Sequence, residues 1–348
     1  MIPSFPDDVE VAVMSHNGRE TLPRLLDCLR AAGAPDDRVA IYDIGSTDET
    51  AEWLARDHRG VVVRRLNDNA GPNPGRNWAI RAAMRPFVLL LDADAFIHAD
   101  APAHLRRALD PAANVGAVAS VIVHANDPTQ VQYAGGALHF VCEAVSPYVG
   151  RPLTDRGSAQ LDIGAAPGMA LLIDVSAAQA CGLFDERYFL GKDDGDFCHR
   201  LRMSGYRLVE EPRAVCEHRS RPRSAWLFPF QIRNRWHFML KNYETRTLIV
   251  LAPALLVHEV LQFGMLVVTG HLADWWRALQ GLRAWLPQLG EDRRVIQDRR
   301  KVRDRDLLTD APLIVRQDMV GGGGGQLLKR AYDGWLRGYW SLATHLLS

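Results

Sequence analysis

Two carboxylates one residue apart end an apolar run in the first third of the chain. The stretch VLLLDADAFI leads from residues 88–91 directly into Asp92 and Asp94. The run lacks polar alternation, which is typical of a strand covered on both faces. Carboxylates are rarely buried unless they are paired or hold a metal, and residues i and i+2 of a strand point the same way. The pair could therefore hold one cation where the strand leaves the core. The alternative is a polar strand end followed by a turn.

A second acidic group lies about a hundred residues further on, in the stretch KDDGD. Asp193, Asp194 and Asp196 stand at the start of a helix predicted over about 194–204 and ended by Gly205. Like charges nearby would raise a carboxyl pKa toward the range useful to a general base, whereas the helix N-terminus would lower it. The sequence leaves open which effect prevails. An acidic first helical turn also occurs without any catalytic role.

Histidine and cysteine offer further metal-binding chemistry. His218, in the stretch VCEHR, is a suitable ligand beside carboxylate and phosphate, although a lone histidine is more often structural. Zinc could be imagined at the Cys198-His199 and Cys216-x-His218 pairs, which lack the short paired spacing of structural zinc sites. The five cysteines form no CxxC, and the N-terminus shows no secretory signal. We therefore expect reduced thiols in a cytoplasmic protein.

The elements that must position these residues follow an alternating pattern. Apolar strand signals over residues 9–14, 39–44 and 61–66 and before Asp92 are separated by helical signals over 21–32, about 47–54 and 78–84. This order predicts right-handed βαβ units and a parallel sheet, in which ligands bind at the carboxyl ends of the strands. The loops SHNG, DIGSTD and DAD lie at those ends.

The composition fits a large globular chain. Its 348 residues are 47% hydrophobic, and 41 basic residues balance 41 acidic ones, which argues against a nucleic-acid partner. Residues 248–269 are apolar except for His258, Glu259, Gln262 and the final threonine, and are long enough to span a bilayer, although Pro253 and Glu259 weaken that interpretation. A final helix over 326–347 would suit a membrane interface. A packed helical subdomain and a homodimer interface are the alternatives. Its predicted apolar stripe consists of Leu328, Tyr332, Trp335, Leu336, Tyr339, Trp340 and Leu347.

Five motifs in order carry a family resemblance: YDIGSTDET, NAGPNPGRNWAI, LLLDADAF, FDERYFLGKDDGDFCHRL and VCEHR. Over residues 9–220 the chain resembles the family-2 nucleotide-sugar glycosyltransferases, and its tail more loosely resembles bacterial rhamnosyltransferase-like members. The resemblance implies an α/β GT-A fold, a Rossmann-like mixed sheet flanked by helices. The glycosyltransferase domain would cover residues 1–225, with a nucleotide-binding half to about 115 and an acceptor half from 116. Residues 226–348 would form a helical, membrane-associated extension.

The resemblance also implies roles for individual residues. Asp194 would be the catalytic base, and Asp94 and His218 would hold a divalent metal, Mg or Mn. Asp193 and Asp196 would contact the acceptor or donor sugar. Asp193 stands where glutamate is usual, and Gly195 and Lys192 also depart from the family pattern, which puts acceptor geometry in doubt. The residues implied for nucleotide binding are Ser15, Asn17, Asp43, Gly75, Arg76, Asn77 and Asp92.

The expected function is therefore an inverting transfer of a hexose or deoxyhexose from a UDP- or dTDP-linked donor to a hydroxyl group. The acceptor would be a glycan or a lipid-linked glycan in cell-surface glycan synthesis. The basic and aromatic tail predicts a peripheral position at the inner face of the cell membrane. Two rivals remain: a non-catalytic scaffold or glycan-binding protein on the same fold, and a sugar nucleotidyltransferase. The second should carry a basic Gly-rich loop after the first strand, which SHNGRE does not provide.

Overall fold

The computed structural model describes residues 4–220, 225–314 and 322–347. The chain divides into two compact units. The N-terminal unit comprises Met1–Gly135 and Tyr148–Pro222, and the C-terminal unit comprises Gly136–Pro147 and Arg223–Ser348. The second division lies close to the boundary predicted at 225. The segment Gly136–Pro147 was predicted in the acceptor half and instead belongs to the C-terminal unit.

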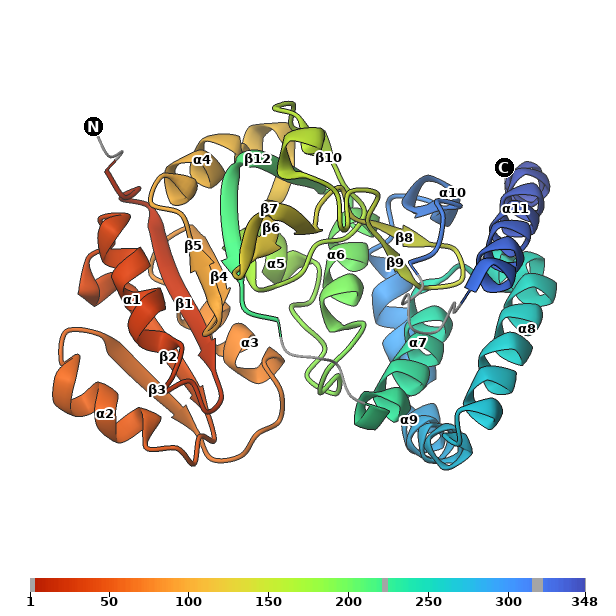
Figure 1. Cartoon of the computed structure of the whole chain (residues 1–348), viewed down its shortest axis with the longest axis horizontal. Helices are drawn as coiled ribbons and strands as arrows, with labels where there is room; N and C mark the ends of the chain where they lie inside the picture. The colour runs from red at the N-terminus through yellow and green to blue at the C-terminus, as the bar shows by residue number, and fades with distance from the viewer. Residues whose placement is uncertain (1–3, 221–224, 315–321, 348) are drawn as a thin grey trace. The chain divides into compact units, whose positions relative to one another are not determined.

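The N-terminal unit is built on a ten-stranded mixed sheet (Figure 1). Four neighbouring strands are parallel, in the order β4 (Phe87–Asp92), β1 (Val9–Ser15), β2 (Val39–Ile44) and β3 (Val62–Leu66). The sheet continues beyond β4 through the antiparallel β11 (Ala170–Asp174). The remaining strands are β6 (Val115–His124), β12 (Arg207–His218), β10 (Leu161–Asp162), β5 (Ala95–Ile97) paired with β12, and β7 (Asp127–Tyr133) paired with β6.

Helices cover both faces of this sheet, as the non-alternating apolar run of β4 predicts. Leu89 and Leu91 pack into one buried cluster with helix α1, and Val88 and Leu90 pack into the other with α3 and α6. Apolar groups on both faces of β4 are therefore removed from water, which confirms the strand predicted before Asp92. The helices of this unit are α1 (Leu22–Ala31), α2 (Thr50–Asp57), α3 (Asn73–Ala82), α4 (Ala101–Ala108), α5 (Val175–Ala180) and α6 (Asp193–Met203).

The C-terminal unit is mainly helical. Its three-stranded sheet joins β8 (Ala137–His139) to β9 (Ala144–Val145) and to β13 (Leu308–Thr309). Phe140 and Trp340 stack in the hydrophobic core of this unit, with ring centroids 5.1 Å apart. They belong to a buried cluster with Phe238 and Leu251. The helices are α7 (Phe228–Asn242), α8 (Thr245–Val268), α9 (Leu272–Asp298), α10 (Asp304–Leu307) and α11 (Gly322–Leu346). Among the described residues, α8 is the one helix long and apolar enough to cross a membrane by length and composition.

Candidate active site

Two buried polar atoms lie at the carboxyl ends of β1 and β2. Ser15 is the last residue of β1 and lies directly opposite Asp43, the last residue but one of β2; the two are 1% and 0% exposed. Asp43 Oδ1 accepts from the Ser46 backbone N–H, but Asp43 Oδ2 and Ser15 Oγ have no hydrogen-bond partner in the described structure. Arg65 Nε lies 3.5 Å from Asp43 Oδ2. Buried polar atoms are normally satisfied, so this pair is suited to a hydroxyl or N–H of a ligand.

Asn17 fixes the two loops that follow these strands. Its backbone N–H donates to Ser46 Oγ at 2.9 Å, and its Oδ1 accepts from the Thr47 N–H at 2.8 Å. The residue adopts a left-handed φ of 53°, which asparagine tolerates better than most residues. Its amide therefore shapes the loops around the Ser15–Asp43 end. Ser46 takes part in this link, and α2 begins only at Thr50, later than the start predicted at about 47.

Gly75 and Asn77 lie on α3, where the structure gives them structural contacts. A Cβ at Gly75 would lie 2.7 Å from Met14 Sδ, so glycine allows α3 to pack closely on the sheet. The Asn77 side chain is buried. Its Nδ2 donates to Phe184 O and Glu186 Oε1, and its Oδ1 accepts from Phe184 N. These contacts differ from the predicted nucleotide contacts: both residues support the backbone behind the site.

Arg76 joins the two acidic groups predicted from the sequence. Its Nη1 lies 2.6 Å from Asp194 Oδ1 and 3.3 Å from Asp193 Oδ2, and its Nη2 lies 3.3 Å from Asp92 Oδ1. The guanidinium is buried, which excludes the alternative of a surface arginine. Burial opposes its charge, but Asp194, Asp92 and Asp193 together raise the pKa of Arg76 above its ordinary value. The ends of β4 and α6 are thus held together through one cation.

The carboxylates around Arg76 differ in environment. Burial raises the pKa of Asp92 to about 6, against the opposing effect of Arg76. Burial and then the charge of Asp194 raise the pKa of Asp193. The Asp194 side chain is 30% exposed, whereas that of Asp193 is 8% exposed and faces Arg76. Asp194 is therefore the carboxylate of α6 that can reach a substrate, and Asp193 lies behind it.

Gly168 is a site residue that sequence reasoning missed. A Cβ there would lie 2.6 Å from Asp194 Oδ1 and 2.8 Å from the Arg76 guanidinium carbon. Both contacts are shorter than real Cβ atoms show, so only glycine leaves room for the Arg76–Asp194 pair. The signal was the Pro-Gly pair just before the apolar run of β11, which reads as an ordinary turn.

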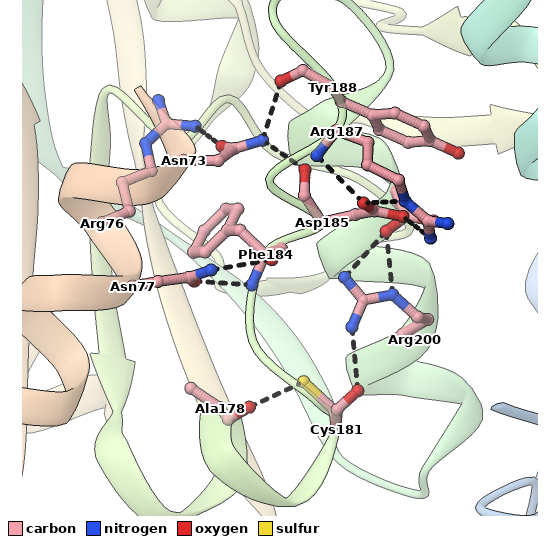
Figure 2. Close-up of polar contacts among 11 residues, drawn as sticks. Asn73, Arg76, Asn77, Ala178, Cys181, Phe184, Asp185, Arg187, Tyr188 and Arg200 are labelled. Carbon is pink, nitrogen blue, oxygen red and sulfur yellow. Dashed lines mark hydrogen bonds and ion pairs between the residues drawn. The ribbon is translucent and has the colours of Figure 1, made fainter. Parts of the chain in front are cut away.

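The loop before α6 is fixed to α3 by two asparagines (Figure 2). Asn73 Nδ2 donates to Asp185 O at 3.0 Å and Tyr188 O at 3.2 Å, and Asn77 binds the Phe184 backbone as described above. Gly71, with a φ of 84°, lies so close to Phe189 O that a Cβ would be 2.2 Å from it. These contacts set where α6 begins and hence where Asp194 points.

Asp196 is buried and serves α6 itself. Arg200, one turn further along, donates its Nε to Asp196 Oδ2 at 2.8 Å and its Nη1 to Cys181 O at 2.8 Å. The Asp196 side chain is 0% exposed, so it anchors the helix rather than meeting a sugar. This burial does not favour the sugar contact predicted for Asp196, which stays a prediction.

Asp94 and His218 come together at the paired ends of β5 and β12. His218 Nε2 lies 3.6 Å from Asp94 Oδ1, and His218 Nδ1 lies 3.0 Å from Gln132 Oε1 of β7. Because an amide oxygen only accepts, this contact favours a proton on Nδ1, and in a neutral ring Nε2 would then carry the lone pair. Metal-binding histidines are usually oriented by such a contact, so this donor set fits a divalent cation. The described residues contain no cluster of three or more protein ligands, so a ligand would have to supply the remaining donors.

A separate cavity of about 650 Å³ opens beside α1, β5 and α4. Its lining includes Arg24, Cys28, His98 and Glu217, and it contains none of the predicted site residues. Glu217 neighbours His218 on β12, and successive strand residues point to opposite faces. This cavity is therefore distinct from the Asp94–His218 pair.

Comparison with known proteins identifies the N-terminal unit. Residues 10–174 match the model of glycosyl transferase family 2. The chain is 24% identical over 203 residues to the poly-beta-1,6-N-acetyl-D-glucosamine synthase of Staphylococcus aureus, covering 58% of this chain and 47% of that protein. Residues 10–174 form a family-2 glycosyltransferase domain. The chain spans about half the length of the curated relatives it matches.

Solved structures support the GT-A fold predicted from the sequence. S. aureus TarS 1-349 in complex with UDP-GlcNAc is similar over 97% of this chain and 90% of that chain, with a TM-score of 0.55 and 15% identity. GalNAc-T7 with UDP, GalNAc and Mn²⁺ is similar over 68% of this chain and 48% of that chain, with a TM-score of 0.54 and 16% identity. The family-2 match ends at Asp174, so Asp194 and His218 lie beyond it and rest on the geometry given above.

Proposed function

We propose that this chain is an inverting glycosyltransferase that moves a sugar from a nucleotide-diphospho-sugar to an acceptor hydroxyl in cell-surface glycan synthesis. The observation that carries the proposal is the convergence on Arg76 of Asp92, at the end of β4, with Asp194, at the start of α6. The family-2 domain supports the reaction class. The similarity to a polysaccharide synthase supports a glycan product.

The nucleoside is proposed to lie at the ends of β1 and β2. Ser15 Oγ and Asp43 Oδ2 are buried atoms that lack a hydrogen bond in the described structure, so a base N–H or a ribose hydroxyl would complete them. Asn17 would shape the wall of this pocket through its bonds to Ser46 and Thr47. We infer a UDP- or dTDP-linked hexose or deoxyhexose as the donor. The UDP-GlcNAc named for the TarS complex is consistent with a uridine donor.

The donor diphosphate is proposed to lie beside Asp94 and His218, which would hold a divalent metal, Mg or Mn. When bound, the metal would neutralise the charge that develops on the departing diphosphate. The contact with Gln132 would orient the His218 ring for this role, and Asp94 would supply an oxygen donor. The Mn²⁺ named for the GalNAc-T7 structure is consistent with this assignment.

Asp194 is proposed to be the general base. Arg76 holds Asp194 Oδ1 at 2.6 Å, and the side chain is partly exposed, so the carboxylate is fixed and within reach of an acceptor. It takes the proton of the acceptor hydroxyl while the oxygen attacks the anomeric carbon. The bond from that carbon to the diphosphate oxygen breaks, and its electron pair leaves with the nucleoside diphosphate. Attack from the opposite face inverts the anomeric centre. The acceptor is proposed to be a glycan or a lipid-linked glycan.

Calorimetric titration with UDP and dTDP, with and without Mn²⁺, tests the donor site. Wild type should bind one of the two nucleotides more tightly with metal. Asp94→Ala should lose the metal-dependent part, and Asp43→Asn should weaken binding with or without metal. Asp100→Ala is the matched control, because this aspartate directly precedes α4, is exposed and makes no side-chain capping hydrogen bond. If neither nucleotide binds wild type, the transferase proposal fails and a non-catalytic scaffold becomes the better explanation.

Asp194→Asn separates chemistry from binding. This variant should bind the nucleotide as wild type does, because Asp194 belongs to the acceptor side of the site. Sugar transfer to an acceptor glycan should fall roughly 10²–10⁴-fold, the usual contribution of a general base. Transfer at the wild-type rate would exclude Asp194 as the base.

A further inference from the structure

Helix α8 leaves one face uncovered, and the large side chains of that face are apolar from Ile249 to Val268. The exposed large side chains of the helix follow helical spacing: Leu256 is 65% exposed and Val260 is 60% exposed. Water-exposed apolar stripes of this length are uncommon on soluble proteins unless something covers them. The large apolar residues that line this face are Ile249, Leu256, Val257, Val260, Leu261, Val267 and Val268.

The opposite face of α8 packs against other residues of the C-terminal unit. Leu251, Ala254 and Leu255 are buried in the core of the C-terminal unit. Glu259 forms an ion pair with the buried Arg235 of α7, and His258 Nδ1 lies 2.8 Å from the Tyr332 hydroxyl. A helix that crossed a bilayer alone would have to break these contacts and place Glu259 in hydrocarbon. The geometry favours a helix that lies along a surface.

Helix α11 runs beside α8 and leaves a second apolar stripe exposed (Figure 1). Tyr332 contacts His258, and seven residues further on the Tyr339 hydroxyl donates to Val250 O at 2.6 Å, so the two helices are antiparallel. The inward face of α11 carries most of the stripe predicted from the sequence, including Leu336 and Trp340. The exposed stripe is a different one and consists of Leu327, Leu328, Trp335, Leu342 and Leu346.

The charges beside these stripes have one sign. Each helix contains a single acidic residue, and both are turned inward: Glu259 pairs with Arg235, and Asp333 pairs with Lys329 at 2.5 Å. The exposed charged residues of the two helices are all arginines, namely Arg246, Arg330 and Arg337. Apolar stripes beside cationic side chains, with no exposed acid, match the charge of an anionic lipid surface.

We propose that α8 and α11 dock the protein on an anionic phospholipid bilayer, with both helices lying in the interface. The apolar stripes enter the boundary between headgroups and acyl chains, and the arginines meet lipid phosphates. The docking surface comprises the two exposed stripes together with Arg246, Arg330 and Arg337. This inference does not depend on the proposed catalysis, because it rests on the C-terminal unit alone and its test needs no sugar donor.

Flotation with vesicles tests the docking surface on the full chain. Wild type should float with phosphatidylglycerol-containing vesicles and float less with pure phosphatidylcholine. It should be released from the anionic vesicles as salt is raised from about 50 to about 500 mM. Salt screens the attraction between arginines and lipid phosphates, and the Debye length falls to ~3 Å at 1 M salt. Leu256→Asp combined with Val260→Asp should reduce binding at least tenfold. Met84→Asp is the matched control, because Met84 is an exposed apolar residue of the N-terminal unit. Circular dichroism and urea unfolding should match wild type for all variants.

A charge variant keeps the proposal testable if the aspartate variant misfolds. Arg330→Gln combined with Arg337→Gln should weaken binding to anionic vesicles roughly 5-fold for each arginine removed. Wild type that stays unbound with anionic vesicles would overturn the proposal. So would aspartate variants that bind like wild type. A lipid-free dimer abolished by Leu256→Asp and Val260→Asp, without vesicle binding, would assign the surface to a second copy. Wild type retained in membranes at high salt and alkaline pH would assign α8 to a membrane span.

Discussion

Arg76 lies among Asp92, Asp193 and Asp194 with almost no exposed surface. We predict that Arg76→Met destabilises the protein by about 3–5 kcal/mol, because removing one partner of a buried ion pair leaves uncompensated charge. Arg81→Met is the control. Arg81 lies on the same helix in an exposed pair with Glu186, so its loss should cost less than about 1 kcal/mol. Urea unfolding at pH 7.5 measures both, and equal costs would contradict the prediction.

At the residue scale, motifs predicted which side chains gather and were weaker on what each one does. Asp92 meets Asp194 through Arg76, and Asp94 meets His218, as the order of motifs suggested. Asp196 lies in the same acidic motif yet faces inward. A motif does not reveal which way a carboxylate points, because that depends on Arg200 one turn away. Gly168 matters because it has no side chain and so leaves room for Arg76 and Asp194. A sequence motif does not reveal a requirement of this kind.

At the element scale, the small sheet of the C-terminal unit contains a buried histidine. His139 ends β8, and its Nδ1 accepts from the Val141 N–H at 3.1 Å. Burial lowers the pKa of His139 to about 4 from an ordinary 6.5, although Glu143 and Asp333 oppose the shift. The unfolded chain therefore takes up this proton first as pH falls. The contribution of neutral His139 to the free energy of unfolding should be lost as pH falls from 6.5 to 4.

We predict that wild type loses about 2 kcal/mol of unfolding free energy between pH 7.5 and pH 4.5 through this histidine alone. His139→Asn should remove that part of the pH dependence, because the asparagine oxygen can still accept from the Val141 N–H and does not titrate. Urea unfolding at the two pH values measures the difference. An unchanged slope with pH in the variant would show that His139 is not the titrating group. His104→Asn is a control at a histidine with no buried hydrogen bond in the described structure.

The parallel strands could be predicted closely because β1, β2 and β4 are mainly apolar. The start of helix α3 could not, since the helical signal covers only residues 78–84. It begins at Asn73, with a proline in its first turn, where the missing N–H costs nothing. That difference in start places Arg76 and Asn77 on the buried side of a helix. The sequence pattern therefore did not indicate the buried contacts that Arg76 and Asn77 make.

At the scale of the whole molecule, all five cysteines are free thiols and only Cys28 is partly exposed. We predict that a thiol reagent labels one cysteine in the folded protein and five in urea. Burial raises the pKa of Cys28, so native labelling should be slow at neutral pH and accelerate as pH rises. Cys28→Ser should abolish native labelling. Two or more reactive thiols without denaturant would show that the cores around the other four open readily.

The division of the chain was predictable at one boundary and not at the other. The basic segment after Arg219 marks a change in composition near Pro222. The segment Gly136–Pro147 carries no such change, and its membership depends on side chains that are distant in sequence. Phe140 stacks on Trp340, and Leu138 pairs with Leu308 in the small sheet. Local patterns cannot reveal partners about 170 and 200 residues away.

That pairing affects the order in which the chain can fold during synthesis. Gly136–Pro147 leaves the ribosome long before Leu308 and Trp340. Its apolar residues therefore cannot be buried until the C-terminal residues have been synthesised. During that interval Leu138, Phe140 and Val141 are exposed to chaperones and to neighbouring chains. A chain cut after Pro222 would keep the family-2 domain and carry this unpartnered loop permanently. The C-terminal unit is therefore not separable from the rest of the chain by a single cut, because Gly136–Pro147 belongs to its core.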